Sequence, residues 1–355
     1  MSPGKRASPG RRKTARGRRS IEVGERHGLH LANVVQRLAQ LRQGAVAVVV
    51  VAALQTDARV HQLAVYLVEA VVGGEHLHGR ALLLPAAGQA RQALRRARVV
   101  AGDYKDLKDA GIIVITAGAN QKPGETRLDL LEKNVGIFKS IIPEVVKYAP
   151  NAILVIAANP VDIMTEVTLK LSGFPKNRVF GTGTVLDSAR FRSILGRHLG
   201  ISPKSVHANV IGEHGDSEVL VWSSAVAGTT CVERLAGQIG KDLDKVVKGS
   251  IDNEVRNSAY TIIKGKGSTY FGIASATQYI CNSIISDKHA ILTVSSHHDE
   301  GIGGYDNICY SLPSIVSKNG VETALVPELC NGEREALEKS AATLSEYTKK
   351  ALAML

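Results

Sequence analysis

The chain has 355 residues, 44% of them apolar and 22% charged, with a formal net charge of +11. Its length is sufficient for one large or two medium-sized domains, and its near-average composition excludes collagenous, coiled-coil and wholly disordered chains. No apolar run approaches the ~18 residues of a membrane span, so we expect no membrane-spanning segment.

The positive charge belongs to one part of the chain. The first 100 residues hold 17 Lys+Arg and 5 Asp+Glu, a net charge of +12, so the other 255 residues carry a net charge of −1. A basic protein often binds nucleic acid. Because the charge describes only one segment here, we expect no nucleic-acid partner for the chain as a whole.

The N-terminal part gives weak structural signals. Residues 1–20 have no acidic residue and no apolar stripe, and we expect them to form a basic, disordered tail. Residues 21–98 are rich in Ala, Val and Arg. Within them, residues 45–54 and 63–72 fit either buried strands or apolar helices, and periodicity does not separate the two.

From residue 99 onwards the pattern is a regular alternation of strands and helices. Short β-branched runs predict strands at residues 111–116, 152–158 and 179–180. Helical spacing over residues 128–148 predicts a helix that is interrupted or kinked at Pro143. Strands that alternate with helices predict a parallel sheet with crossover connections.

The second half continues with strands at residues 206–211, 219–223, 290–295 and 308–317. A long segment with a polar face surrounds residues 242–264, and a helix is predicted over residues 333–355. An apolar stripe on that helix predicts packing against the rest of the protein. The stripe consists of Leu337, Ala341, Leu344, Tyr347 and Ala351.

Four cysteines, Cys231, Cys281, Cys309 and Cys330, lie far apart and form no CxxC pair. This spacing favours neither a zinc site nor a disulfide framework, and it fits a reducing compartment. We therefore expect buried free thiols, no metal and a cytoplasmic location. The basic N-terminus also fits an organelle transit peptide.

Two polar loops follow predicted parallel strands. The loop AGANQKPGETR, at residues 117–127, is rich in Gly and ends in Arg127, which suits closure over a bound anion. The loop ANPVD, at residues 158–162, would direct the amide of Asn159 into the same crevice. Ligands of open α/β sheets bind at the carboxyl ends of strands, so together the loops predict a ligand site. Alone, each also fits a surface loop or a helix cap.

Two further motifs supply groups for acid–base chemistry. In LDSARFR, Asp187 and Arg190 lie three residues apart on one helical face, where they suit orienting a base and gripping a substrate carboxylate. Taken alone, the pair would be a surface ion pair. In IGEHGD, His214 lies in a Gly-flanked turn after a strand. Histidine is the usual acid–base group at neutral pH, and a nearby carboxylate stabilises its protonated form.

In this order and spacing, GANQKPGETR, NPVD, LDSARFR and GEHGD resemble the L-lactate/malate dehydrogenase family, and its lactate branch in particular. The resemblance covers about 255 residues, from Val99 to the C-terminus. It implies an α/β fold in which a Rossmann-type, doubly wound parallel sheet is followed by an α+β substrate domain. The implied NAD-binding domain spans residues 21–182, of which 21–98 are atypical, and the substrate domain spans residues 183–355.

The resemblance also implies a role for each matching residue. His214 would donate and accept the proton, with Asp187 holding its ring. Arg127 would polarise the substrate carbonyl from the closing loop, and Arg190 would anchor the substrate carboxylate. Such a site suits hydride transfer between NAD and a 2-hydroxy acid. The implied substrate-binding residues are Gln121, Arg127, Asn159, Arg190 and Thr269.

Gln121 indicates the substrate. The family's malate enzymes place Arg here, which pairs with a second carboxylate. A neutral Gln leaves that charge unpaired in a desolvated pocket, so pyruvate and L-lactate fit better. Malate dehydrogenase remains the alternative. The resemblance further implies a homotetramer, and Arg192 and His207 match the pair that binds fructose bisphosphate in bacterial lactate enzymes, although both also fit ordinary interface residues.

The cofactor region is incomplete. The family opens with a strand, a G-x-G-x-x-G turn and a helix, whereas residues 44–54 read GAVAVVVVAAL. Glu69 is a weak substitute for the family's ribose-binding acid, and Leu77-His-Gly79 is a weak match to a later motif. The missing glycines predict weak or absent NAD binding. The positions that match the family's NAD contacts are Tyr104, Gly118, Ala119, Ser140, Ala157, Ala158, Asn159 and Thr182.

Three explanations fit the first hundred residues: a mis-assigned reading frame, a diverged βαβ unit, or a subunit that has lost NAD binding. The last of these makes a catalytically inactive, basic-tailed binding protein the alternative to an enzyme. Missing NADH oxidation, together with salt-sensitive binding to nucleic acid through residues 1–100, would distinguish it.

Overall fold

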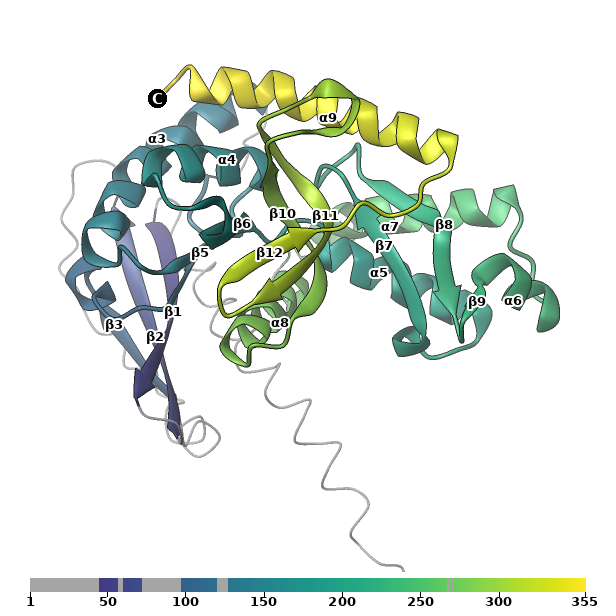
Figure 1. Ribbon diagram of the computed structural model, residues 1–355, viewed down its shortest axis with the longest axis horizontal. Helices are drawn as coiled ribbons and strands as arrows, with labels where there is room; N and C mark the ends of the chain where they lie inside the picture. Colours follow the sequence, from purple (N-terminus) through teal and green to yellow (C-terminus); the bar gives the residue numbers. More distant parts are fainter. Residues whose placement is uncertain (1–44, 57–59, 72–96, 120–126, 267–268, 270) are drawn as a thin grey trace, which may run out of the picture.

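The computed structural model describes residues 45–56, 60–71, 97–119, 127–266, 269 and 271–355. The predicted tail at residues 1–20, the loop around Gln121 and the Leu77–Gly79 motif lie outside the described residues. Figure 1 shows a large sheet with helices on both faces, a smaller sheet beside it and a long helix at the C-terminal end.

The large sheet has, among the described residues, the strand order β12-β11-β10-β6-β5-β4-β1-β2-β3. Its middle and one edge therefore contain the order 3-2-1-4-5-6 of a doubly wound dinucleotide-binding fold. The strands are β1 (Ala45–Thr56), β2 (Val60–Val71), β3 (Ala97–Gly102), β4 (Ile112–Ile115), β5 (Ile153–Ile156), β6 (Val179–Gly181), β10 (Ala290–His298), β11 (Ile308–Ser317) and β12 (Gly320–Ala324).

The sheet is mixed, and its central strands are parallel as predicted. Strands β4, β5 and β6 are parallel, as are β2 and β3. Strand β1 is antiparallel to both β2 and β4. Only residues 57–59 connect β1 to β2, and a parallel pair needs a crossover of about a dozen residues or more. The short connection therefore produces a hairpin in place of the first crossover.

Side chains that alternate along the central strands separate two cores. On β4, Ile113 and Ile115 pack in one cluster, with α3 (Arg127–Tyr148) and α4 (Val161–Ser172). Ile112 and Val114 face the other side and pack with α8 (Phe271–Ile285). This period of two explains why the central strands read as continuous apolar runs. Helix α3 runs without interruption through Pro143, so the alternative of a broken helix is wrong.

A second lobe surrounds the smaller sheet, β7-β8-β9. Its separate core includes Phe191 and Leu195 from α5, and Val210 and Leu220 from β7 and β8. Phe191 packs edge-on against Trp222, with ring centroids 4.8 Å apart. The elements are α5 (Val185–Leu199), β7 (Val206–Ile211), β8 (Val219–Ala227), β9 (Thr230–Cys231), α6 (Val232–Gln238) and α7 (Lys245–Lys266).

Both halves of the chain contribute strands to the large sheet. Strands β10–β12 come from beyond residue 183 and join it through one pair of residues, Ser295 and Gly181. A Cβ at Gly181 would lie 2.6 Å from Thr165 Oγ1 and 2.8 Å from a methyl of Val161, so glycine permits the close approach of α4 to β6. Short 3₁₀ turns lie at Tyr104–Leu107, Lys176–Arg178, Pro203–Ser205 and Ile302–Gly304.

The last helix, α9 (Asn331–Leu352), spans both lobes along one side of the protein (Figure 1). Leu337, Ala341 and Leu344 are buried in the main core, which confirms that the predicted stripe serves packing. Lys139 Nζ donates to the carbonyl of Met354 at 2.9 Å and so ties the C-terminus to α3. Within the described ranges, no helix is both long and apolar enough to cross a membrane.

Candidate active site

His214 lies in the turn that follows β7. The preceding Gly212 has φ = 84°, and a Cβ there would lie 2.8 Å from Ser340 Oγ, so the turn requires glycine. The backbone N–H of His214 donates to Asp162 Oδ2 at 2.8 Å. These contacts fix the turn, while the His214 side chain stays 26% exposed. The ring is therefore held in place but remains accessible.

One turn of α5 brings Asp187 and Arg190 to this histidine. His214 Nδ1 lies 2.6 Å from Asp187 Oδ2, and Arg190 Nη1 donates to Asp187 Oδ1 at 2.8 Å. Asp187 is 4% exposed and Arg190 is 15% exposed. The structure thus brings together the three residues that the sequence selected from two motifs. With Nδ1 engaged by Asp187, Nε2 is the ring nitrogen left to face a substrate.

The charges of this cluster favour a protonated histidine. Burial lowers the pKa of His214, but the charge and hydrogen bond of Asp187 outweigh it, and the pKa rises to about 9. Burial raises the pKa of Asp187, and its contacts with His214 and Arg190 outweigh this effect, so the pKa is lowered. At neutral pH the pair is therefore an imidazolium next to a carboxylate, which is the state that can donate a proton.

Two buried acids beside the cluster were missed by sequence reasoning. Burial raises the pKa of Asp162 to about 6, and burial and then the charge of Asp187 raise that of Glu218 to about 8. Asp162 Oδ1 and Glu218 Oε1 are buried side-chain oxygens without a hydrogen-bond partner. Asp162 ends the ANPVD loop and Glu218 lies two residues after IGEHGD, but only the fold shows that both are buried near His214.

The loops that follow β4 and β5 lie close together, and the second of them leads to Asp162, which accepts from the backbone of His214. Buried Asn134, on α3, links the two loops: its Oδ1 accepts from the N–H of Ala119 at 2.7 Å, and its Nδ2 donates to the carbonyl of Asn159 at 2.7 Å. A Cβ at Gly118 would lie 3.4 Å from that of Ala158. One buried amide and small residues therefore hold the two loops close together. Asn134 gave no sequence signal, because one Asn in a helix is usually a surface residue.

The other predicted site residues are more scattered. Thr182 is buried, and Ser140 is exposed on α3, where its hydroxyl donates to the carbonyl of Ile137 at 2.7 Å. Burial raises the pKa of Tyr104 to about 12. Thr269 is partly exposed. Gln121 and the side chain of Arg127 lie outside the described residues, although Arg127 begins α3.

The two predicted effector residues lie on neighbouring elements. Arg192, on α5, donates through Nε to the carbonyl of Ala208 at 2.7 Å and through Nη2 to Asn209 Oδ1 at 2.8 Å. His207 is exposed on β7. The guanidinium is therefore held against the strand that carries His207.

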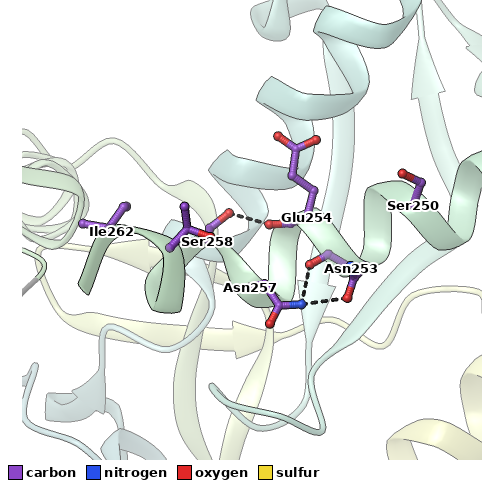
Figure 2. A pocket seen from close by; sticks show the side chains of 7 residues that line it. Ser250, Asn253, Glu254, Asn257, Ser258 and Ile262 are labelled. Carbon is purple, nitrogen blue, oxygen red and sulfur yellow. Dashed lines mark hydrogen bonds between the residues drawn. The ribbon is translucent and has the colours of Figure 1, made fainter. Parts of the chain in front are cut away.

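A separate open groove of about 530 Å³ runs along α7 (Figure 2). Its polar side chains already bond along the helix, since Asn257 Nδ2 donates to Asn253 Oδ1 at 2.7 Å. None of the predicted site residues lines it. The residues that line the groove are Ser250, Asn253, Glu254, Asn257, Ser258, Thr261 and Ile262. Outside the groove, Tyr260 of α7 donates to Asp216 Oδ1 at 3.0 Å, in the turn that holds His214.

A dinucleotide-type sheet with a His–Asp pair beside its strand ends is the arrangement expected of a nicotinamide-dependent oxidoreductase. Comparison with known families makes this specific. The lactate/malate dehydrogenase NAD-binding domain matches residues 41–181, and the alpha/beta C-terminal domain of the same family matches residues 184–355. The chain belongs to the lactate/malate dehydrogenase family.

Several relatives share one name. The L-lactate dehydrogenase of Allorhizobium ampelinum is 50% identical over 248 residues, 70% of this chain and 80% of that protein. The L-lactate dehydrogenase of Thermus aquaticus is 47% identical over 246 residues, 69% of this chain and 79% of that protein. A minor L-lactate dehydrogenase from Enterococcus mundtii, solved with ligands bound, has a TM-score of 0.69 at 36% identity and covers 74% of this chain and 85% of its own.

NAD is the family's cofactor, and the described residues fit one end of it. Gly118, Ala119 and Ala158 are small residues at the strand ends, where a nicotinamide would lie. The pyrophosphate end differs, because it needs a helix that begins directly after the first strand. Here residues 57–59 lead from β1 straight into β2. The β1–β2 hairpin therefore supplies no helix for the pyrophosphate.

Proposed function

We propose that the chain interconverts pyruvate and L-lactate as an NAD-dependent L-lactate dehydrogenase. The observation that carries this proposal is the Asp187–His214 pair, with Nδ1 and Oδ2 2.6 Å apart, next to the carboxylate-binding group Arg190. It is supported by the L-lactate dehydrogenase names of the relatives. NAD supplies and accepts the hydride when bound.

In pyruvate reduction, His214 gives the proton from Nε2 to the carbonyl oxygen of the substrate. The carboxylate of Asp187 stabilises the imidazolium until transfer and fixes the ring through Nδ1. Arg190 pairs with the substrate carboxylate through its guanidinium. Since Arg190 also donates to Asp187, the same carboxylate positions both the acid and the anchor. In lactate oxidation the proton returns to Nε2.

The loop residues complete the proposed site. Arg127, at the start of α3, would stabilise the developing alkoxide when the loop closes and excludes water. Asn159 would donate to the substrate oxygen, Thr269 would line the pocket, and Gln121 would select a neutral substrate side chain. Residues 21–182 would bind NAD and residues 183–355 would bind substrate.

The substrate assignment is tested with Gln121→Arg. We expect wild-type protein to reduce pyruvate faster than oxaloacetate, and the variant to reverse this order, because Arg pairs with the second carboxylate. Initial rates of NADH oxidation with each substrate give the ratio. A wild-type preference for oxaloacetate would instead support the malate alternative.

The hairpin between β1 and β2 favours a second candidate, a homologue that has lost NAD binding. Isothermal titration of the full chain with NADH is expected to show weak binding, because the hairpin provides no glycine turn at a helix N-terminus. Micromolar affinity would contradict this expectation. Undetectable binding together with no NADH oxidation would favour the inactive homologue over the enzyme.

We further propose a cytoplasmic homotetramer. Exposed apolar residues on α7, such as Val246 at 79% and Tyr260 at 58% exposure, support an interface between subunits. Arg192 and His207 would bind a fructose bisphosphate effector across such an interface. Light scattering with and without fructose bisphosphate gives the mass of the assembly and tests both the tetramer and the effector site. A monomer mass under both conditions would refute the two proposals.

A further inference from the structure

Three potential metal ligands converge at a place remote in sequence from the His214 turn. Glu166 comes from α4, His297 from β10 and Cys309 from β11. His297 and Cys309 are directly opposite each other in the antiparallel β10–β11 pair. Helix α4 crosses the same region, and so the carboxylate of Glu166 meets both side chains. The site combines three different elements.

The contacts of the cluster centre on one carboxylate oxygen. His297 Nδ1 lies 2.7 Å from Glu166 Oε2, and the Cys309 thiol donates to the same oxygen at 3.1 Å. The three ligand atoms all lie within 4.8 Å of one another, the one such group found in the described part of the chain. Glu166 is 5% exposed and Cys309 is 1% exposed. The donor atoms therefore face each other away from bulk water.

The surroundings of His297 suit a metal ligand. When one ring nitrogen of His binds a metal, the other usually donates to a carboxylate, which fixes the ring. His297 Nε2 lies 3.3 Å from Asp299 Oδ1. Asp299 in turn forms an ion pair with Lys176. The nitrogen that faces Glu166 and Cys309 is thus the one oriented for a metal.

We propose that Glu166, His297 and Cys309 form a binding site for Zn²⁺ or a chemically similar divalent cation. A thiolate, an imidazole and a carboxylate are the ligands that zinc prefers, and water would be the fourth. Zinc–ligand bonds of about 2.0–2.3 Å place tetrahedral ligand atoms about 3.3–3.7 Å apart. The His297–Glu166 and Cys309–Glu166 contacts, now 2.7 and 3.1 Å, need to open by only about half an ångström.

Binding replaces protons with a metal. The Cys309 thiol and Nδ1 of His297, which faces the Glu166 carboxylate, lose their protons to solvent, the sulfur and the nitrogen bond to the cation, and no oxidant or reductant takes part. The bound cation joins α4 to the β10–β11 hairpin. Helix α4 also carries Asp162, one turn before Glu166, and Asp162 holds the backbone of His214. The site would therefore stabilise the element that supports the His214 turn.

The spacing of the cysteines alone predicted no zinc site, and this proposal revises that expectation. Cys309 is 12 residues from His297 and 143 residues from Glu166 in the chain. Ligands so far apart form no recognisable motif. The proposal uses no residue assigned to lactate chemistry, so it does not depend on the proposed function.

Cobalt gives a direct test, because Co²⁺ bound to thiolate has a charge-transfer band in the near ultraviolet. The full chain would carry Cys231→Ser and Cys330→Ser, which remove the two exposed thiols. After treatment with a chelator, it is titrated with Co²⁺. We expect the band to saturate at one equivalent and to disappear when Zn²⁺ is added in excess.

The decisive comparison is between two buried cysteines. Cys309→Ser should abolish the band, whereas Cys281→Ser, on the buried face of α8, should retain it. His297→Asn keeps Cys309 in place and should weaken cobalt binding by at least tenfold. Circular dichroism checks that each variant is folded, and His297→Asn tests the site if Cys309→Ser does not fold. A band that is absent, or equal in all variants, would overturn the proposal.

Discussion

The Asp187–His214 pair makes the most specific prediction. In Asp187→Asn the charge that raises the pKa of His214 to about 9 is removed. Burial then acts against only the weaker contributions of Asp162 and Glu218, and the pKa should fall to its ordinary value of 6.5 or below. The difference between 6.5 and about 9 corresponds to about 3 kcal/mol.

The rate effect follows from the protonated fraction. At pH 8, a group with a pKa of about 9 is roughly nine-tenths protonated, whereas one with a pKa of 6.5 is about 3% protonated. Protonation alone therefore predicts about a thirtyfold loss of pyruvate reduction at this pH. Disturbance of Arg190, which also binds Asp187, would add to the loss.

The assay is kcat/KM for pyruvate as a function of pH, followed through NADH absorbance. In wild-type protein the rate should fall above a pKa of about 9, and in the variant it should fall from 6.5 or below. Asp216→Asn is the matched control, since Asp216 lies in the same turn and its Oδ1 accepts from Tyr260. If Asp187→Asn kept its falling limb near 9, the assignment of His214 as the proton donor held by Asp187 would be refuted.

Two further predictions concern stability. The folded-state pKa of Glu218 is raised to about 8, so its contribution to stability is fully present below about 4.5 and is lost as the pH rises to about 8. Glu218→Gln should therefore raise the free energy of unfolding more at pH 8 than at pH 4.5, and equal gains in urea melts at both values would contradict this. Gly181→Ala should destabilise by about 1–3 kcal/mol, because its Cβ would lie 2.6 Å from Thr165 Oγ1, whereas Gly136→Ala in α3 meets nothing within 4 Å and should stabilise. If Gly181→Ala and Gly136→Ala shifted the denaturant midpoint in the same direction from the wild-type value, the packing argument would be contradicted.

The central part of the fold could be predicted from the sequence because local pattern and burial agree there. The runs at residues 111–116 and 152–158 became β4 and β5, and the C-terminal stripe became the buried face of α9. The direction of β1 could not be predicted from its apolar residues. It depends on the number of residues that connect it to β2, and this becomes clear only when both are known to be strands.

The candidate site, like the fold, could be predicted from the sequence only in part. His214, Asp187 and Arg190 lie in motifs whose spacing already suggests chemistry. Asn134 and Glu218 do not, because their importance arises from burial and from contacts with segments distant in the chain. Side-chain clusters that the fold assembles across elements have no fixed spacing, and physical reasoning can find them only after the strands are aligned.

At two places in the large sheet, neighbouring strands are joined by very few residue pairs, and this affects the internal motions of the sheet. Strand β1 meets β4 through only two residue pairs, Val48–Ile115 and Val49–Val114, and β6 meets β10 through one. Pairing within the groups is more extensive, with twelve residue pairs between β1 and β2, nine between β10 and β11, four between β4 and β5 and three between β5 and β6. Groups of strands joined this way open as separate cooperative units. Amide hydrogen exchange should therefore divide the sheet into three panels, β3-β2-β1, β4-β5-β6 and β10-β11-β12, each with its own protection against solvent.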